Sequence, residues 1–324
     1  MKADAAEIEG HMRTLARQPW LGAGRAAWPL HLFRIDDARA AADILNCGAI
    51  YSRRRAERGG VLNHDSASAS VIEHSPEWCK QCVRLYFRPK TPTEHESEGF
   101  RPPTQLPWGA HRPMPVVFVF DAIPILTADS TVFTDGNAGR GRHQRGTDAA
   151  FLKQIPFDKV YHTGAFQSGD RDEIIFRRCA EVLVPDALPL TNLRHVFCRS
   201  QAEHETLFSL LTPTAKVMHG KKIGVSASLH YKKWTFLESV DLTSEKVRLR
   251  FSPSTLTPGP FRVRMEIFDE NDQVRAMWRD DAFLANREQV IGLSRIALPR
   301  YRVTVTLDGN LAYQNSFVAE ATLL

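Results

Sequence analysis

Near the middle of the chain, a single glutamate interrupts a run of small and apolar residues. Glu181 stands in the segment CAEVLVP, residues 179–185. A carboxylate in such a run either points to solvent by the alternation of a strand or is held in a cleft at a cost in desolvation. The second position would allow acid–base chemistry or the stabilisation of a developing positive charge. The residues alone leave both interpretations open.

Two other features would have to lie near Glu181 to make a site. His31 opens the alternating segment LHLFRI (30–35), and several arginines follow the next segment, at positions 53–55 and 58. A lone histidine is more often structural or exposed than a ligand, so neither feature identifies a site alone.

A glycine- and arginine-rich segment, GRGRHQRG (139–146), could bind a polyanion. Arg140, Arg142 and Arg145 are separated by glycines and other small or polar residues. Arginines on such a loop can follow a phosphodiester backbone and supply affinity without sequence readout. The alternative is a solvated basic loop without a function.

Several other chemistries lack their motifs. Cys79-Lys-Gln-Cys82 could be half of a zinc site completed by His64 or His74, but no second CxxC exists, and we expect no metal. There is also no Walker-type loop, no GxGxxG after a strand and no HExxH. These absences weaken the kinase, ATPase, dehydrogenase and metalloprotease interpretations.

The bulk properties predict a protein of the cytoplasm with two domains. The 324 residues and 43% hydrophobic content allow two packed cores, and a net charge of +5 suits a polyanionic partner. Five cysteines are too few and odd in number for a disulfide framework. The N-terminus resembles no signal peptide, and no apolar run reaches the ~18 residues of a membrane span.

The expected fold class is α+β, followed by an all-β region. We expect a helix and linker over 1–29, strands over 30–35, 82–89, 116–122, 179–185 and 191–200, and helices over 36–48, 147–160 and 201–211. Residues 52–82 are expected to form a loop with one helical turn near 76–79, and residues 92–115 an irregular excursion.

Beyond residue 222 the chain consists of short alternating segments separated by turn residues. The seven segments are LHYKKWTF, KVRLRF, FRVRMEIFD, QVRAMWRD, EQVIGLSRI, YRVTVTLDG and LAYQNSFVA. This pattern predicts an antiparallel β-sandwich, immunoglobulin-like in architecture, over 222–324. Its basic strands suggest target recruitment or partner docking, and the alternative is a structural cap.

The segment 30–200 resembles the DarT family of nucleic-acid ADP-ribosyltransferase toxins. LHLFRIDDARAAADILNCGAIYSRR resembles the family's opening, in which a strand with a histidine precedes a helix and a basic stretch. VRLYFRPKTPTEHESEG resembles its YF-x-P strand and turn, and RRCAEVLVPDALPLTNLRHVFCRS resembles the segment around its catalytic glutamate. VVFVFD and VFTDG lie between them in collinear order.

The resemblance implies a PARP-like split β-sheet over 30–212 that binds NAD as co-substrate. It makes Glu181 the catalytic carboxylate, places His31 in the NAD pocket and suggests Arg54 as the reactive-centre arginine, with Arg53, Arg55 and Arg58 as alternatives. The other residues expected to contact NAD are Leu30, Leu32, Ile50 and Tyr86, and the aromatic rings of Phe87 and Phe133 could stack or belong to the core. Phe33, Arg34 and Thr93 depart from the family's motifs.

The chemistry explains these residue types. Breaking the bond between nicotinamide and ribose builds positive charge on the ribose, which a carboxylate stabilises. An arginine beside the pyrophosphate neutralises its charge.

We therefore expect ADP-ribose transfer to a base of single-stranded DNA, with RNA as an open alternative. An antitoxin or an ADP-ribosyl hydrolase is an expected partner. The rivals are transfer to protein or water and a non-catalytic nucleic-acid-binding module.

Overall fold

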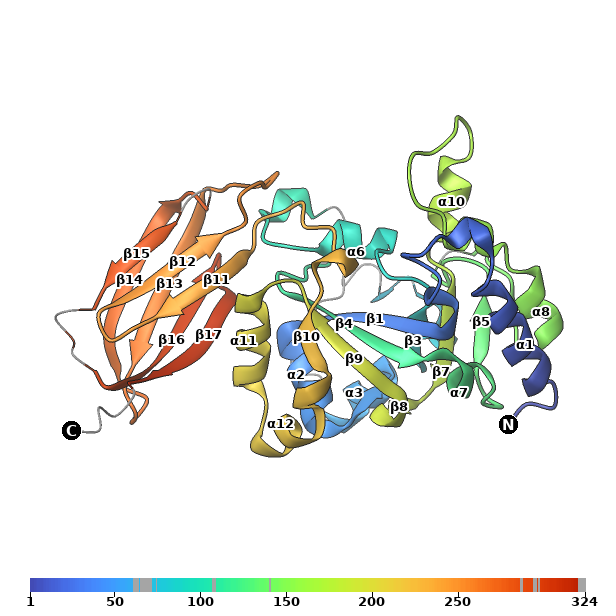
Figure 1. The fold of residues 1–324 in the computed structure, drawn as a ribbon, viewed down its shortest axis with the longest axis horizontal. Coiled ribbons are helices and arrows are strands. Elements are labelled where there is room, and N and C mark those ends of the chain that lie inside the picture. Colours follow the sequence, from blue (N-terminus) through green and yellow to red (C-terminus); the bar gives the residue numbers. More distant parts are fainter. Residues whose placement is uncertain are drawn as a thin grey trace. The chain divides into compact units, whose positions relative to one another are not determined.

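The computed structural model describes residues 1–60, 64, 72–73, 75–106, 109–139, 141–285, 288–293, 296 and 298–319 (Figure 1). The α-helices are α1 (Ala5–Leu15), α2 (Ala38–Cys47), α3 (Arg53–Gly59), α5 (Glu77–Lys80), α6 (Pro92–Ser97), α7 (Ala122–Leu126), α8 (Ala149–Gln154), α9 (Phe157–Val160), α10 (Arg171–Arg177), α11 (Gln201–Leu210) and α12 (Pro213–His219). Short 3-10 turns include η2 (Trp28–Leu30). None of the described helices is long and apolar enough to cross a membrane.

The strands are β1 (His31–Asp37), β2 (Ala49–Tyr51), β3 (Cys82–Tyr86), β4 (Pro115–Asp121), β5 (Val132–Thr134), β6 (Arg145–Gly146), β7 (Glu181–Pro185), β8 (Ala187–Pro189), β9 (Leu193–Cys198), β10 (Ile223–Val225), β11 (Leu237–Leu242), β12 (Lys246–Phe251), β13 (Phe261–Phe268), β14 (Val274–Phe283), β15 (Gln289–Gly292), β16 (Arg300–Leu307) and β17 (Asn310–Val318).

The chain forms two compact units that are interleaved in sequence. The first unit comprises Met1–Ile35, Cys47–Glu96 and Val117–Val196, and the second comprises Asp36–Asn46, Ser97–Val116 and Phe197–Leu324. The sequence predicted two domains that are continuous in sequence, 30–212 and 222–324. That division into domains stays a prediction.

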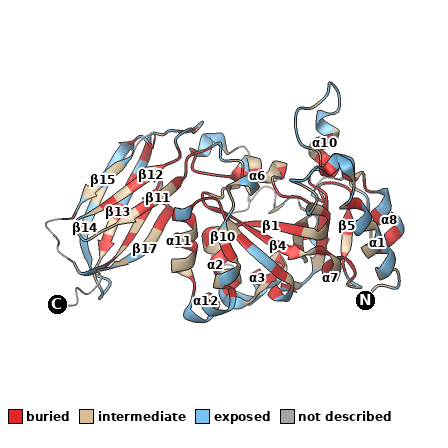
Figure 2. Cartoon of the chain, viewed as in Figure 1, coloured by how far each residue is buried: buried red, intermediate tan, exposed pale blue. Residues whose placement is uncertain are grey.

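The largest sheet has the strand order β10-β9-β4-β1-β3-β7-β5-β6. Its strands β1 and β3 pair at one position only, Phe33 with Tyr86, whereas β3 and β7 pair along five residues. The pairing of β1 with β3 is therefore shorter than that of β3 with β7, as in a sheet made of two halves. β4 is buried at six of its seven positions, which explains its continuous apolar sequence VVFVF (Figure 2).

The helix after β1 begins and ends where the sequence predicts. The Asp37 carboxylate accepts a hydrogen bond from the Arg39 N–H at 3.3 Å, as an N-cap residue does. Gly48 has a φ of +78°, the left-handed conformation that commonly follows a helix. Two expectations of irregular structure were wrong. Residues 53–59 form α3, capped by Ser52, and residues 92–97 form α6.

The C-terminal region contains two antiparallel sheets, with the orders β11-β12-β15 and β14-β13-β16-β17. Six of the seven predicted segments contain these strands. LHYKKWTF was predicted wrongly, because its residues precede β11 and only Thr235 makes an isolated bridge, to Phe100. The buried positions of β13 and β16 alternate with exposed or half-buried ones, so each strand has one buried face.

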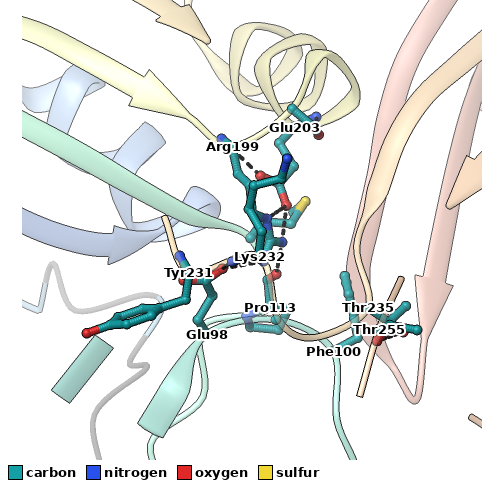
Figure 3. A network of polar contacts seen from close by, with 12 residues as sticks. Glu98, Phe100, Pro113, Arg199, Glu203, Tyr231, Lys232, Thr235 and Thr255 are labelled. Carbon is teal, nitrogen blue, oxygen red and sulfur yellow. Dashed lines mark hydrogen bonds and ion pairs between the residues drawn. The ribbon is translucent and has the colours of Figure 1, made fainter. Parts of the chain in front are cut away.

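A buried ion-pair network lies within the second unit (Figure 3). Arg199 donates to Glu98 at 3.1 Å and to the Pro113 carbonyl at 2.9 Å, and it also pairs with Glu203. All three charged side chains are fully buried. Glu98 in turn accepts the N–H groups of Tyr231 and Lys232. Burial raises the pKa of Glu203 to about 7, since one guanidinium serves two carboxylates.

We predict that Arg199→Met lowers the free energy of unfolding by about 3–5 kcal/mol, because two buried carboxylates lose their cation. The loss should be larger at pH 8 than at pH 6, since protonation of the orphaned carboxylates relieves part of it. Urea unfolding at both pH values measures this. Arg248→Met is the control, because Arg248 forms exposed pairs and should cost less than about 1 kcal/mol. Equal losses in the two variants would contradict the prediction.

A second prediction concerns removal of residues 222–324. Phe100 donates its N–H to the Thr235 carbonyl at 2.9 Å, and Tyr313 donates its hydroxyl to Glu205 at 2.7 Å. The fragment 1–221 loses these partners and the apolar surfaces beside them, so we expect it to aggregate or to melt without a cooperative transition. Circular dichroism and size exclusion of the fragment test this, and a monomeric, cooperatively folded fragment would refute it.

Candidate active site

The residues predicted to act together lie on one face of the sheet, where β1 pairs with β3. Phe33 of β1 is paired with Tyr86 of β3, and Tyr86 is paired with Glu181 of β7. Directly paired residues of antiparallel strands point to the same face, so these three side chains form one row. His31 precedes Phe33 by two residues and shares its face, and their rings lie 6.5 Å apart. The backbones of β1 and β7 are about 10 Å apart at this row.

Glu181 is fully buried and is bound by an arginine of the neighbouring strand. Arg84 donates from Nε to Oε2 at 2.7 Å and from Nη2 to Oε1 at 2.6 Å. Arg84 is paired with Leu183 in the register, two residues along from Tyr86, so its side chain leaves the same face. Burial acts to lower the pKa of Arg84, but the Glu181 carboxylate outweighs it and the pKa lies well above the usual value.

The backbone around Glu181 is fixed from the neighbouring strand β5. The Glu181 N–H donates to the Thr134 hydroxyl at 3.0 Å, and that hydroxyl donates to the Gly136 carbonyl at 2.8 Å. The Ala138 N–H points to the Glu181 carboxylate at 3.4 Å, a long hydrogen bond. Ala138 also packs with Cys79 and Leu183 in a small apolar cluster beside the carboxylate. Glu181 is thus held by segments that are distant from it in the sequence.

His31 is half-buried, with its ring partly fixed by the main chain. Nδ1 lies 2.9 Å from the Ala27 carbonyl, and since a carbonyl only accepts, Nδ1 carries the proton in this contact. Nε2 is then the atom with a lone pair. Burial lowers the pKa of His31 below its ordinary value, and the Ala27 hydrogen bond and the Asp121 carboxylate only partly oppose this. His31 is therefore a neutral acceptor near pH 7.

The other predicted NAD contacts differ in exposure. Tyr86 is half-exposed on the face of Glu181, and Leu30 is half-buried at the end of η2. Leu32 and Ile50 are core residues with at most 1% of their surface exposed. Their side chains therefore pack in the core and hold strands β1 and β2 in place.

Two further aromatic residues lie away from the row. Phe87 is buried and packs edge-to-face on Phe157. Phe133 is paired with Val182, so it faces the opposite side of the sheet from Glu181, where the Lys2 ammonium lies 4.0 Å from its ring. Both belong to the core.

The predicted reactive-centre arginine is engaged elsewhere. Arg54 pairs with Glu77 through two hydrogen bonds and with Glu57 at 3.2 Å. No hydrogen bond or ion pair joins Arg54 to Glu181 among the described residues. Of the alternatives, Arg53 pairs with Glu57, and Arg55 pairs with Asp186. Which of these arginines contacts NAD stays a prediction.

The arginines of the glycine-rich loop lie on aromatic rings. The Arg145 guanidinium stands 4.3 Å over the Trp78 ring, and that of Arg142 stands 4.2 Å over the ring of Phe176. Both arginines remain exposed, so their outer surfaces can meet a polyanion. Arg140 lies outside the described residues. Trp78 precedes Cys79 of the cluster beside Glu181, which places Arg145 near the carboxylate.

The two cysteines of the CxxC pair differ in burial, and the candidate ligand His74 lies outside the described residues. Cys79 is buried and Cys82 is half-buried, and burial raises the pKa of both thiols, to about 11 for Cys79. Among the described residues no group of potential ligands includes either cysteine.

A comparison with protein families identifies the chain. The sequence model described as ssDNA thymidine ADP-ribosyltransferase, DarT, matches residues 33–231, more than half of the chain. The chain belongs to the DarT family. It is therefore an NAD-dependent ADP-ribosyltransferase, as the sequence predicted.

Solved DarT structures resemble this chain in fold. Thermus sp. 2.9 DarT in complex with ADP-ribosylated ssDNA is 16% identical, with a TM-score of 0.50 over 63% of this chain and 97% of that one. The same Thermus protein in complex with NAD+ is 15% identical, with a TM-score of 0.48 over 63% and 98%. Thermosipho africanus DarTG in complex with ADP-ribose is 16% identical, with a TM-score of 0.49 over 65% and 53%. No curated protein matches this DarT-family chain.

The sequence did not indicate Arg84, which among the described residues is the one charged side chain bonded to the Glu181 carboxylate of this DarT-family protein. In CVRLY the half-buried positions 82, 84 and 86 alternate with fully buried ones, so the strand itself was evident. The pairing of β3 with β7 was not, because the two strands are about a hundred residues apart.

We predict that NAD affinity is nearly constant between pH 6.5 and 8 and falls only at lower pH, because the lowered pKa keeps His31 neutral. Titration of NAD by calorimetry across this range measures it. His31→Gln, which retains a side-chain acceptor, should remove the acid-side decrease while weakening binding. An unchanged decrease in His31→Gln would assign it to another group.

Proposed function

We propose that this DarT-family protein transfers ADP-ribose from NAD to the base of thymidine in single-stranded DNA, with Glu181 as catalytic carboxylate and His31 as an NAD-binding residue. One observation supports this most strongly. His31, Tyr86 and Glu181 share one face where β1 and β3 are paired only once. The family match supplies the substrate class, since its description names ssDNA thymidine.

The donor set of this face fits NAD. The His31 Nε2 can accept a hydrogen bond from a ribose hydroxyl, and the half-exposed Tyr86 ring can stack on an aromatic base. Leu30 and the backbones of Leu32 and Ile50 would contribute shape. Arg54 is a candidate for the pyrophosphate, since the exposed carboxylates beside it can be exchanged for a phosphate.

In the proposed reaction, the bond between the nicotinamide nitrogen and ribose C1′ breaks, and nicotinamide leaves with the bonding electron pair. The positive charge that develops on the ribose is stabilised by the carboxylate of Glu181. A ring nitrogen of the base forms the new bond to C1′ and releases its proton to Glu181 or to water. The products are the ADP-ribosylated base, nicotinamide and one proton.

The acceptor strand would follow the glycine-rich loop. Arg142 and Arg145 are exposed, are held on aromatic rings and lie on a segment continuous with Ala138 beside Glu181. Phosphate contacts of this kind position a strand without reading its sequence. Arg140 is proposed to act with them on sequence grounds alone.

The surrounding biology is also a proposal. The Thermosipho relative is DarTG in complex with ADP-ribose, which supports an antitoxin or ADP-ribosyl hydrolase as partner and a role as a toxin, in the cytoplasm. For 222–324 we propose an immunoglobulin-like sandwich. The bonds of Phe100 with Thr235 and of Tyr313 with Glu205 favour the structural-cap role over recruitment.

The test is labelled NAD with separate pools of single-stranded DNA, RNA and protein. We expect label in DNA, a thymidine adduct in the nucleoside mass spectrum, and a loss of at least 10³-fold in Glu181→Gln, which keeps the shape but not the charge. Glu205→Gln, an acid of the second unit, is the control. Label confined to free ADP-ribose or to protein would favour transfer to water or to protein. Unchanged nicotinamide release in Glu181→Gln would contradict the assignment of Glu181 as the catalytic carboxylate.

A further inference from the structure

The orientation of the Glu181 carboxylate is fixed by an arginine of the neighbouring strand. Both Glu181 oxygens receive N–H groups of Arg84, at 2.6 and 2.7 Å, in the bidentate arrangement that fixes a carboxylate in plane. Glu181 has no exposed surface, whereas the Arg84 side chain is 28% exposed. The pair is thus closed on the carboxylate side and open on the guanidinium side.

In the described part of the chain, Arg84 forms the one ion pair that Glu181 makes. The thiols of Cys79 and Cys179 also lie near the carboxylate, and burial raises their pKa values to about 11 and about 12, so both are neutral. The remaining contacts are the Ala138 N–H and the Thr134 hydroxyl, which bonds the main chain only. Arg84 is therefore the cation that compensates this buried carboxylate.

We propose that Arg84 is a positioning residue for the transfer, which holds the Glu181 carboxylate in its reactive orientation through two hydrogen bonds. The inference rests on the proposed function, because it assumes that Glu181 acts on NAD. A buried carboxylate without a cation takes up a proton at higher pH than a paired one, and a protonated acid cannot stabilise positive charge on the ribose. Arginine suits this role because it cannot release its own proton to the carboxylate.

The proposed role of Arg84 predicts how its variants change kcat, KM and the pH–rate profile. Arg84→Met should lower kcat on the order of 100-fold, the scale of a misplaced reacting group, with a much smaller change in KM for NAD. The acid limb of its pH–rate profile should move to higher pH. Arg84→Lys, which keeps the charge but loses the planar fork, should show a smaller loss in kcat and little movement of the acid limb.

Chemical rescue separates positioning from folding. Millimolar guanidinium or methylguanidinium added to Arg84→Ala should restore at least tenfold of kcat, and ammonium should restore less. Thermal melting shows whether each variant folds. Arg250→Met is the matched control, since Arg250 also forms paired hydrogen bonds with carboxylates but belongs to the second unit. Its kcat, pH profile and response to guanidinium should stay those of the parent protein.

The possible results distinguish a failure of the role of Arg84 from a failure of the proposed function. If the parent protein transfers ADP-ribose, Glu181→Gln is inactive and Arg84→Met keeps the parent kcat and acid limb, the role of Arg84 is refuted and the proposed function stands. A rise in kcat in Arg84→Met would show that the pair restrains Glu181, which also refutes positioning. If Glu181→Gln retains activity, the proposed function itself fails.

Discussion

The burial of the Glu181 carboxylate is the constraint on which the candidate site depends. A carboxylate without solvent is costly unless a cation and hydrogen bonds replace water. The sheet meets this requirement by register, since the pairing of Tyr86 with Glu181 puts Arg84 on the same face within reach. A shift of β3 by one residue would turn Arg84 to the other face and leave the carboxylate unpaired.

Arg199 also binds buried carboxylates, and its contrast with Arg84 separates structure from function. Arg199 is entirely enclosed with two carboxylates and a main-chain carbonyl, so a substrate has no access to it. Arg84 has a single carboxylate partner and an exposed edge. A closed network of the first kind favours one packing of its unit, whereas an open pair can also face a ligand.

Local patterns in the sequence predicted much of the fold, and long-range pairing limited the rest. The segments 30–35, 82–89, 116–122 and 179–185 each contain a strand, because alternation and apolar runs are local properties. The helices at 53–59 and 92–97 were missed, since charged and proline-containing sequences carry weak periodicity. His31 and Glu181 were proposed from the resemblance, and the strand register puts them on one face, while their roles stay predictions. Arg84 could not be found, because its role arises only from strand pairing.

The charges of this region also differ in how easily they can be exchanged. Glu181 and Arg84 form an ion pair on one face of the sheet. Separating them would leave a buried charge without its partner. Arg54, Glu57 and Glu77 form exposed pairs, and water and salt compensate such groups when they part. Another anion can therefore compete for the exposed arginine while the buried pair stays intact.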